Sequence, residues 1–182
     1  MTPSRYRTDG AATEIRFAID ECSLGSILVA QSGLGICAIL LGDDPEKLVC
    51  DLQDSFPRTN LIGDDTELKQ LVIKVVSFIE APDTDLDLSL DMRGTAFQQR
   101  IWQILREIPV GQTVSYTDIA RHLGIPQSVR AVARACAANK LAVAIPCHRV
   151  VRQDGALAGY RWGVERKRAL LEKEANTAKA RL

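Results

Sequence analysis

Start and stop signals divide residues 94–138 into three short helices. Each predicted helix has a small or polar residue before it and an apolar face at helical spacing within it. The last two helices have the length and turn chemistry of a helix-turn-helix motif, which helical hairpins that do not bind DNA share. The predicted helices begin after Gly94-Thr95, at Ser115 with Asp118 as its capping-box partner, and at Gln127 or Ser128, and they end near Ile108, Gly124 and Ala138.

The residues before 94 have the pattern of a mixed sheet and helix region. Apolar stretches from Ile15 to Leu41 predict strands, and Ser26–Ala30 is expected to pair with Ile36–Leu41 around the turn residues Ser32-Gly33-Leu34-Gly35. The fold class is therefore α/β, with a division into residues 1–92 and 93–182. The other predictions here are a flexible arm at 1–14, helices at 45–56 and 66–79, and an edge strand or a linker at 82–91.

Charge is balanced over the whole chain but not along it. The 23 basic and 23 acidic residues cancel, yet residues 1–93 hold 8 basic and 17 acidic residues, whereas residues 94–182 hold 15 and 6. A basic half beside an acidic half indicates that one half faces a polyanion such as nucleic acid, although a basic face that is merely solvated is the simpler alternative.

Composition places the chain among ordinary globular proteins. Of its 182 residues 46% are hydrophobic and 25% charged, and no apolar run is long enough to cross or enter a membrane. We therefore expect a cytoplasmic protein. The five cysteines include no C-x-x-C pair, and His122 and His148 are the two histidines, so free thiols and no metal site are expected.

A thiol and an imidazole are adjacent in Ile145-Pro146-Cys147-His148-Arg149-Val150. A cysteine has a pKa of about 8.5, so it needs an imidazole or a cation nearby to become a nucleophile at neutral pH. His148 and Arg149 are the candidates, and a bend at Pro146 would let His148 approach Cys147 directly or through water. A cysteine in this position is more often a small buried apolar residue, so the dipeptide alone is a weak signal.

The third predicted helix is rich in alanine, which suits close approach to DNA better than base reading. Arg130 and Arg134 are its large side chains, and they could hold phosphates or insert into the duplex. Because an enzyme that modifies a base must take it out of the stack, Arg130 is our candidate for filling the space that is left. The small residues of this helix are Ala131, Ala133, Ala135, Ala137 and Ala138.

Several motifs in one order make the chain similar to the O6-alkylguanine-DNA alkyltransferases, above all to the carboxyl-terminal half of the bifunctional Ada proteins. The resemblance covers essentially the whole chain, and it implies a small ribonuclease-H-like domain followed by a winged helix-turn-helix domain. The motifs are Gly35-Ile36-Cys37-Ala38-Ile39-Leu40-Leu41-Gly42, Val114-Ser115-Tyr116, Arg130-Ala131-Val132, Ala138-Asn139-Lys140, the segment from Ile145 to Val151, and Gly159-Tyr160-Arg161-Trp162-Gly163.

The resemblance also implies roles for individual residues. Cys147 would accept the alkyl group, and His148, oriented by Glu174, would activate it through water. Asn139 would act as a hinge, and Tyr116 would press on the target's 3′ phosphate and donate toward guanine N3. The DNA-binding residues would be Arg130, Tyr116, Ser128, Ala131 and Arg134, and the substrate pocket would be formed by Val150, Tyr160, Arg161 and Trp162.

The implied activity is a single transfer from O6-methylguanine, and from O4-methylthymine, in double-stranded DNA to Cys147. A thioether has no good leaving group, so each monomer would act once and need no cofactor. The zinc of some family members and the phosphotriester-repair module of Ada are not expected within these residues. Two alternatives from other classes are a winged-helix transcription factor, which gives Cys147 no task, and a cysteine hydrolase, which needs an oxyanion hole.

Overall fold

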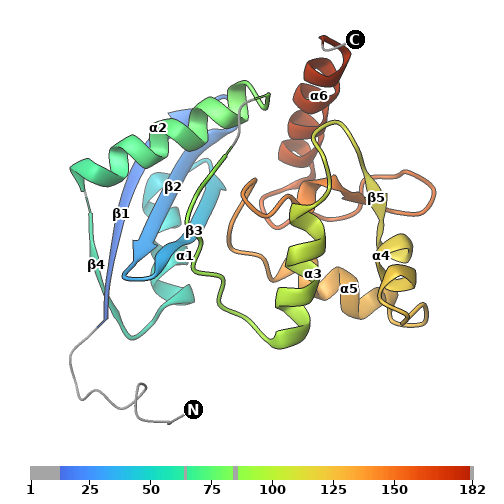
Figure 1. Ribbon diagram of the computed structural model, residues 1–182. Coiled ribbons are helices and arrows are strands. Elements are labelled where there is room, and N and C mark those ends of the chain that lie inside the picture. Colours follow the sequence, from blue (N-terminus) through green and yellow to red (C-terminus); the bar gives the residue numbers. More distant parts are fainter. Residues whose placement is uncertain (1–12, 64, 84–85, 181–182) are drawn as a thin grey trace.

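A computed structural model describes residues 13–63, 65–83 and 86–180 of the chain, and Figure 1 shows a sheet-containing half beside a mainly helical half. The first half contains β1 (Thr13–Cys22), β2 (Gly25–Ser32), β3 (Gly35–Gly42) and β4 (Thr59–Ile62) in the order β3-β2-β1-β4. The predicted hairpin is confirmed as the antiparallel pair β2 and β3, in which Ala30 lies opposite Ala38.

Two features of this sheet differ from the sequence prediction. Thr13 and Glu14, expected in a flexible arm, belong to β1, and the rest of that predicted arm lies outside the described residues. The strand β4 was not predicted; it pairs in parallel with the start of β1. Its four residues are too few for a periodic pattern, and its partner is more than 40 positions away in the sequence, so local signals do not reveal it.

Helices cover both faces of the sheet. The helix α2 (Thr66–Glu80) packs on β1 and β2, and α1 (Pro45–Ser55) packs on β2 and β3 from the other side (Figure 1). Both predicted helices are confirmed, and each begins at an aspartate whose carboxylate accepts from the backbone of the first turn. With both faces covered, β2 and β3 are apolar almost throughout instead of alternating.

The segment predicted as an edge strand or a linker combines both properties. It leads away from the sheet, but Ile36 N–H donates to Ser89 O at 2.8 Å and Asp91 N–H donates to Ile36 O at 2.8 Å, so the chain forms one bridge with the free edge of β3. A Cβ on Gly35 would lie 2.6 Å from Ser89 O. Glycine at this position therefore lets the connection approach β3 closely.

The second half contains the three short helices that the start and stop signals predict, followed by a longer fourth helix. The elements are α3 (Ala96–Arg106), α4 (Tyr116–His122), α5 (Val129–Ala137) and α6 (Val164–Ala180). Capping boxes start α3 at Thr95 and α4 at Ser115, and Ser128 is the N-cap of α5 without a side-chain hydrogen bond. The strands β5 (Val114–Ser115) and β6 (Val150–Val151) form a short parallel ladder, and η2 (Cys147–Arg149) is one 3₁₀ turn.

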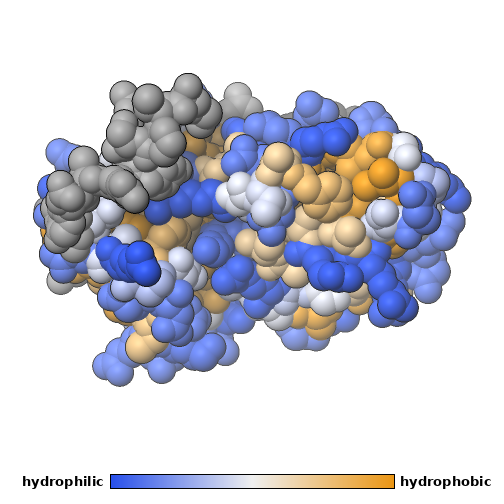
Figure 2. All heavy atoms as spheres, turned by 90° about the horizontal axis from the view of Figure 1, so that it is seen from below, coloured by the Kyte–Doolittle hydropathy of each residue, from blue (hydrophilic) through white to orange (hydrophobic). Residues whose placement is uncertain are grey.

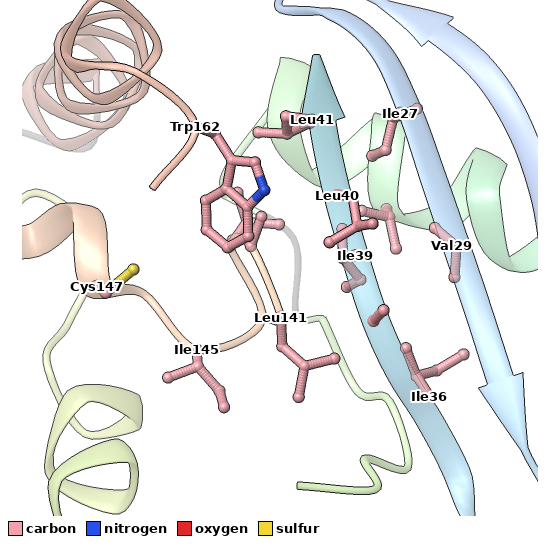
Figure 3. Packing of buried hydrophobic residues seen from close by; sticks show 14 of the residues in the cluster. Ile27, Val29, Ile36, Ile39, Leu40, Leu41, Leu141, Ile145, Cys147 and Trp162 are labelled. Atoms are coloured by element: carbon pink, nitrogen blue, oxygen red, sulfur yellow. The ribbon is translucent and has the colours of Figure 1, made fainter. Parts of the chain in front are cut away.

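The two halves share one core and meet along the edge of β3. Ile39 N–H donates to Lys140 O at 2.9 Å, and Ala142 N–H donates to Ile39 O at 3.1 Å. Figure 3 shows Leu141 and Trp162 between β3 and the turn that carries Cys147. The segment that contains the candidate nucleophile is therefore attached directly to the sheet.

No helix in the described part of the chain is long and apolar enough to span a membrane.

The shared core predicts a large cost for shortening a side chain at the junction. Ile39 is fully buried, so Ile39→Ala should lower the free energy of unfolding by about 3 kcal/mol through lost burial and the cavity left behind. Leu34→Ala is the matched control, because Leu34 is 78% exposed, and it should change stability by less than about 0.5 kcal/mol. Urea unfolding followed by circular dichroism measures both values. Equal effects of the two substitutions would contradict a single shared core.

Candidate active site

Cys147 is presented by a tight bend of the backbone. Pro146 has φ −79° and ψ 62°, and Cys147 N–H donates to Ile145 O at 2.8 Å. These values describe an inverse γ-turn, which proline favours because its ring holds φ near this value. The bend predicted at Pro146 is confirmed, and it leads straight into the 3₁₀ turn η2.

The Cys147 thiol is protonated at neutral pH. Its side chain is buried but lines a pocket of about 520 Å³. Burial raises the pKa of Cys147 to about 11, and the hydrogen bond from Asn139 and the charge of Lys167 offset only part of this effect. A base is therefore needed to form the thiolate.

Asn139 connects the end of α5 to the Cys147 turn. Its side-chain nitrogen donates to Ile145 O at 2.9 Å, to Leu141 O at 3.3 Å and to Cys147 Sγ at 3.3 Å, and its side-chain oxygen accepts from Leu141 N–H at 2.8 Å. The residue is fully buried. This one side chain thus fixes the direction of the loop and donates to the sulfur.

His148 belongs to a buried cluster of charged and polar groups behind the turn. His148 Nε2 lies 2.7 Å from Glu174 Oε1, and Arg149 donates to the same carboxylate through Nη2 at 2.8 Å and Nε at 3.0 Å. Arg149 Nη1 also donates to Ile108 O at 2.6 Å. The cluster joins η2, α6 and the residues after α3, because its members come from all three places.

The cluster determines which nitrogen of His148 carries the proton. Burial alone would raise the pKa of Glu174, but the hydrogen bonds and charges of His148 and Arg149 lower it to about 2, so Glu174 is ionised. Burial lowers the pKa of His148, despite the opposing effect of Glu174, so the ring is neutral at pH 7. A neutral ring beside a carboxylate carries its hydrogen on Nε2. Nδ1 then has a free lone pair, and it makes no hydrogen bond to the described residues.

In two places the sequence offered two neighbouring residues for one role, and the structure distinguishes between them. Arg149, a sequence candidate for stabilising the thiolate, is instead bound to Glu174 and to Ile108 O. Of the two glutamates on the last helix, Glu174 is buried against His148, whereas Glu172 is exposed. The resemblance, and not the local pattern, had pointed to Glu174.

The pocket collects several of the predicted site residues from different elements. Tyr116, at the start of α4, contacts the same space as Cys147, and burial raises its pKa to about 12, so its hydroxyl stays a hydrogen-bond donor. The buried Tyr160 hydroxyl has no hydrogen-bond partner among the described residues. The lining consists of Tyr116, Val129, Arg130, Ala133, Cys136, Ala137, Cys147, Arg152, Ala158, Gly159, Tyr160 and Arg161.

Other predicted residues lie outside this lining. Val150 is fully buried in β6, and Trp162 lies behind Tyr160, with ring centroids 5.2 Å apart in an edge-to-face arrangement. Ala135, expected among the residues that allow close approach to DNA, is buried, and its carbonyl accepts from Trp102 Nε1 at 2.9 Å. Also outside the lining are Ser128, Ala131 and Arg134 of the predicted DNA-binding set.

Lys167 is a buried cation that the sequence interpretation missed. It is fully buried on α6, and its Nζ donates to Ala158 O at 3.1 Å and lies 5.9 Å from the Tyr116 ring centroid. No carboxylate of the described residues pairs with it, and burial lowers its pKa. Lys167, Leu170 and Glu174 are spaced so that they lie on one buried face of α6. Because Lys167 and Glu174 are charged, this face gives no amphipathic signal in the sequence.

The outer face of the helical half and the lining of the pocket both combine apolar with charged side chains. Seen from below, the helical half has an apolar area flanked by hydrophilic side chains (Figure 2). The pocket lining itself combines two alanines of α5, the half-buried Ala133 and the exposed Ala137, with three arginines. Within the described residues, no group of three or more His, Cys, Asp or Glu side chains is arranged to hold a metal ion.

A family model and curated proteins match this chain. The model for the 6-O-methylguanine DNA methyltransferase DNA-binding domain matches residues 96–176. The bifunctional transcriptional activator/DNA repair enzyme Ada of Escherichia coli is 54% identical over 96% of this chain and 49% of its own length. A methylated-DNA–protein-cysteine methyltransferase of Mycobacterium bovis is 43% identical over 69% of this chain and 76% of its own length.

Solved structures agree with the sequence matches. The crystal structure of Mycobacterium tuberculosis OGT in complex with DNA has a TM-score of 0.76 and 33% identity, covering 89% of this chain and 94% of that one. The chain spans about half the length of the two Ada proteins that it matches.

The buried cluster predicts a specific dependence of stability on pH. The pKa of Glu174 is about 2 in the folded protein and 4.5 as its ordinary value, so folded Glu174 binds its proton less readily than unfolded Glu174. Its contribution is therefore fully present above pH 4.5 and is lost as the pH falls toward 2, by about 3 kcal/mol in all.

Glu174→Gln tests this prediction by urea unfolding between pH 7 and pH 3. The variant should be destabilised by about 3 kcal/mol at pH 7, because Arg149 loses its buried counter-charge. On acidification, the difference in the free energy of unfolding between the variant and the natural protein should become smaller. Glu172→Gln, an exposed change on the same helix, should follow the natural protein throughout. A gap that stayed constant with pH would show that Glu174 contributes through packing alone.

Proposed function

The chain belongs to the methylated-DNA–protein-cysteine methyltransferase family, and from this premise we propose that it transfers the methyl group of O6-methylguanine in duplex DNA to its own Cys147. One observation carries the proposal: a buried thiol lines a pocket and stands next in sequence to an imidazole whose free nitrogen and tautomer are set by a buried carboxylate. The arrangement supplies a nucleophile, a base and an orienting group.

The first step is removal of the thiol proton. His148 is neutral, so Nδ1 accepts the Cys147 proton through one water molecule, and Glu174 stabilises the imidazolium that forms. Asn139 donates to the sulfur and remains a partner for the thiolate. The charge of Lys167 acts in the same direction, because it lowers the pKa of Cys147.

The second step is in-line attack of the thiolate on the methyl carbon. The new S–C bond forms as the C–O6 bond breaks, and the electron pair of that bond leaves on guanine. Tyr116 donates a proton toward guanine N3, and the proton held by His148 afterwards restores the phenol. Across the reaction the thiol proton thus replaces the methyl group on the base, and no cofactor takes part.

The product explains the stoichiometry that we propose. S-methylcysteine is a thioether whose carbon–sulfur bond offers water no good leaving group, so the acceptor is not regenerated. Each protein molecule acts once. O4-methylthymine presents the same alkoxy carbon on a smaller ring, and we include it as a substrate on that basis.

Engagement of DNA follows from the elements that surround the pocket. In this proposal α4 and α5 act as the helix-turn-helix of a winged-helix domain, and the sheet half is ribonuclease-H-like. Arg130 lines the pocket from the first turn of α5, where it can fill the space that the extruded base leaves. One chain holds every group named, so a monomer suffices.

Labelled substrate tests the central step. Duplex DNA with one O6-methylguanine carrying a labelled methyl group should transfer one label per protein molecule to the peptide that contains Cys147, as peptide mass mapping would show. Cys147→Ala should abolish transfer, whereas Cys50→Ala, a change at an exposed thiol on α1, should leave it intact. Label on another cysteine, or release of many product molecules per protein, would contradict the proposal.

The pH profile of transfer tests the role of His148. If His148 takes the proton, the rate constant should be level from about pH 6.5 upward, because the pKa of the ring lies below its ordinary value. A thiol that ionises without this base would instead react about tenfold faster per pH unit up to its pKa of about 11. Single-turnover measurements between pH 6 and pH 9 distinguish the two, and a steady rise would exclude His148 as the base.

A further inference from the structure

The parallel ladder of β5 and β6 places Arg152 beside Tyr116. Val114 pairs with Val150 and Ser115 with Val151, so Tyr116 and Arg152 are the next residues of the two strands. Both line the pocket of Cys147. Burial raises the pKa of Tyr116, and the charge of Arg152 acts on the same hydroxyl in the opposite direction, as expected for close neighbours.

The backbone around Arg152 is fixed, but its guanidinium is free. Arg152 N–H donates to Ala156 O at 3.0 Å, and Gly155 N–H donates to Arg152 O at 2.9 Å, which closes a tight turn. Gly155 has φ +83°, a conformation that glycine adopts without strain. The side chain of Arg152 is exposed and makes no hydrogen bond or ion pair within the part of the chain described.

The charges around the pocket have one sign. Arg130 from α5, Arg152 from the turn after β6 and Arg161 from the segment before α6 all line it, and none of the lining residues is acidic. Guanidinium groups on three separate elements, without a carboxylate among them, favour an anion that extends across the mouth. The sugar-phosphate backbone on both sides of an extruded nucleotide is such an anion, because only the base enters the pocket.

We propose that Arg152 binds the DNA phosphate next to the extruded nucleotide on the Tyr116 side of the pocket, as a positioning residue for the transfer. The inference rests on the proposed function and extends it. The guanidinium is planar and offers paired N–H donors, so it can hold two phosphate oxygens at once. A contact at this point fixes the backbone where the nucleotide leaves the duplex.

The first test measures the salt dependence of binding to duplex DNA that contains O6-methylguanine, using proteins in which Cys147→Ala prevents reaction. Adding Arg152→Gln should lower the slope of log affinity against log salt by about 0.9 and weaken binding about fivefold near 0.15 M salt. Arg152→Lys should keep the slope. Lys69→Gln, an exposed change on α2, removes the same charge away from the helical half and should alter neither quantity.

The second test identifies the phosphate. Duplexes that carry one neutral methylphosphonate, placed in turn at each phosphate within two nucleotides of the target, are bound to proteins with and without Arg152→Gln. At one position beside the target, neutralising the phosphate should weaken binding about fivefold with Arg152 present and have no further effect in the variant. If the losses of affinity caused by the methylphosphonate and by Arg152→Gln multiply independently at every position, the proposal is overturned.

A third measurement separates this proposal from a structural role and from the proposed function. Transfer from duplex DNA is compared with transfer from the free base O6-methylguanine, which has no phosphate. In protein that keeps Cys147, Arg152→Gln should lower the ratio of the duplex rate to the free-base rate about fivefold. Lys69→Gln should not change this ratio. An equal loss on both substrates would mean a damaged pocket and refute the phosphate contact. Absence of transfer in the natural protein would refute the proposed function alone, because the binding cycles above need no reaction.

Discussion

The buried carboxylate of Glu174 is the interaction on which the rest of the site depends. It lies between His148 and Arg149, and Arg149 continues to Ile108 O, so one ionised group joins α6, the Cys147 turn and the residues after α3. An ionised carboxylate buried this deeply needs a cation and hydrogen-bond donors in good geometry to offset the lost hydration. The pairing therefore fixes how three separate segments meet, and it also leaves Nδ1 of His148 as the free nitrogen.

Asn139 and the edge of β3 hold the chain that leads into the Cys147 turn. Asn139 restrains the turn through two backbone carbonyls and one backbone N–H, and the loop that follows pairs with β3 through Ile39. Val143, within this loop, has φ 60° as the central residue of a strained γ-turn that Ala144 N–H closes with Ala142 O at 2.7 Å. The sheet edge and Asn139 together hold this conformation.

Local signals account for what could be predicted from the sequence. The helix start at Thr95, the capping box at Ser115 and the hairpin around Gly33 depend on signals within a few residues, and the structure contains all three. Contacts between distant segments carried no such signal: β4, the ladder of β5 and β6, and the bridge between Ile39 and Leu141 were not predicted. The buried face of α6 contains Lys167 and Glu174, so its charges resemble an exposed face, and only family resemblance distinguished Glu174 from Glu172.

A protonated, buried thiol at position 147 suits the proposed transfer, in which each protein molecule would react once. A thiol with a pKa of about 11 is a poor nucleophile toward dissolved electrophiles and oxidants, and its position inside a pocket limits their access further. His148 can remove the proton, but its lone pair is as buried as the sulfur. In the proposed reaction the thiolate therefore becomes useful only when a flat base fills the pocket and brings its alkyl carbon to the sulfur. Under this proposal, burial of the thiol would reserve its one transfer for the substrate that fits the pocket.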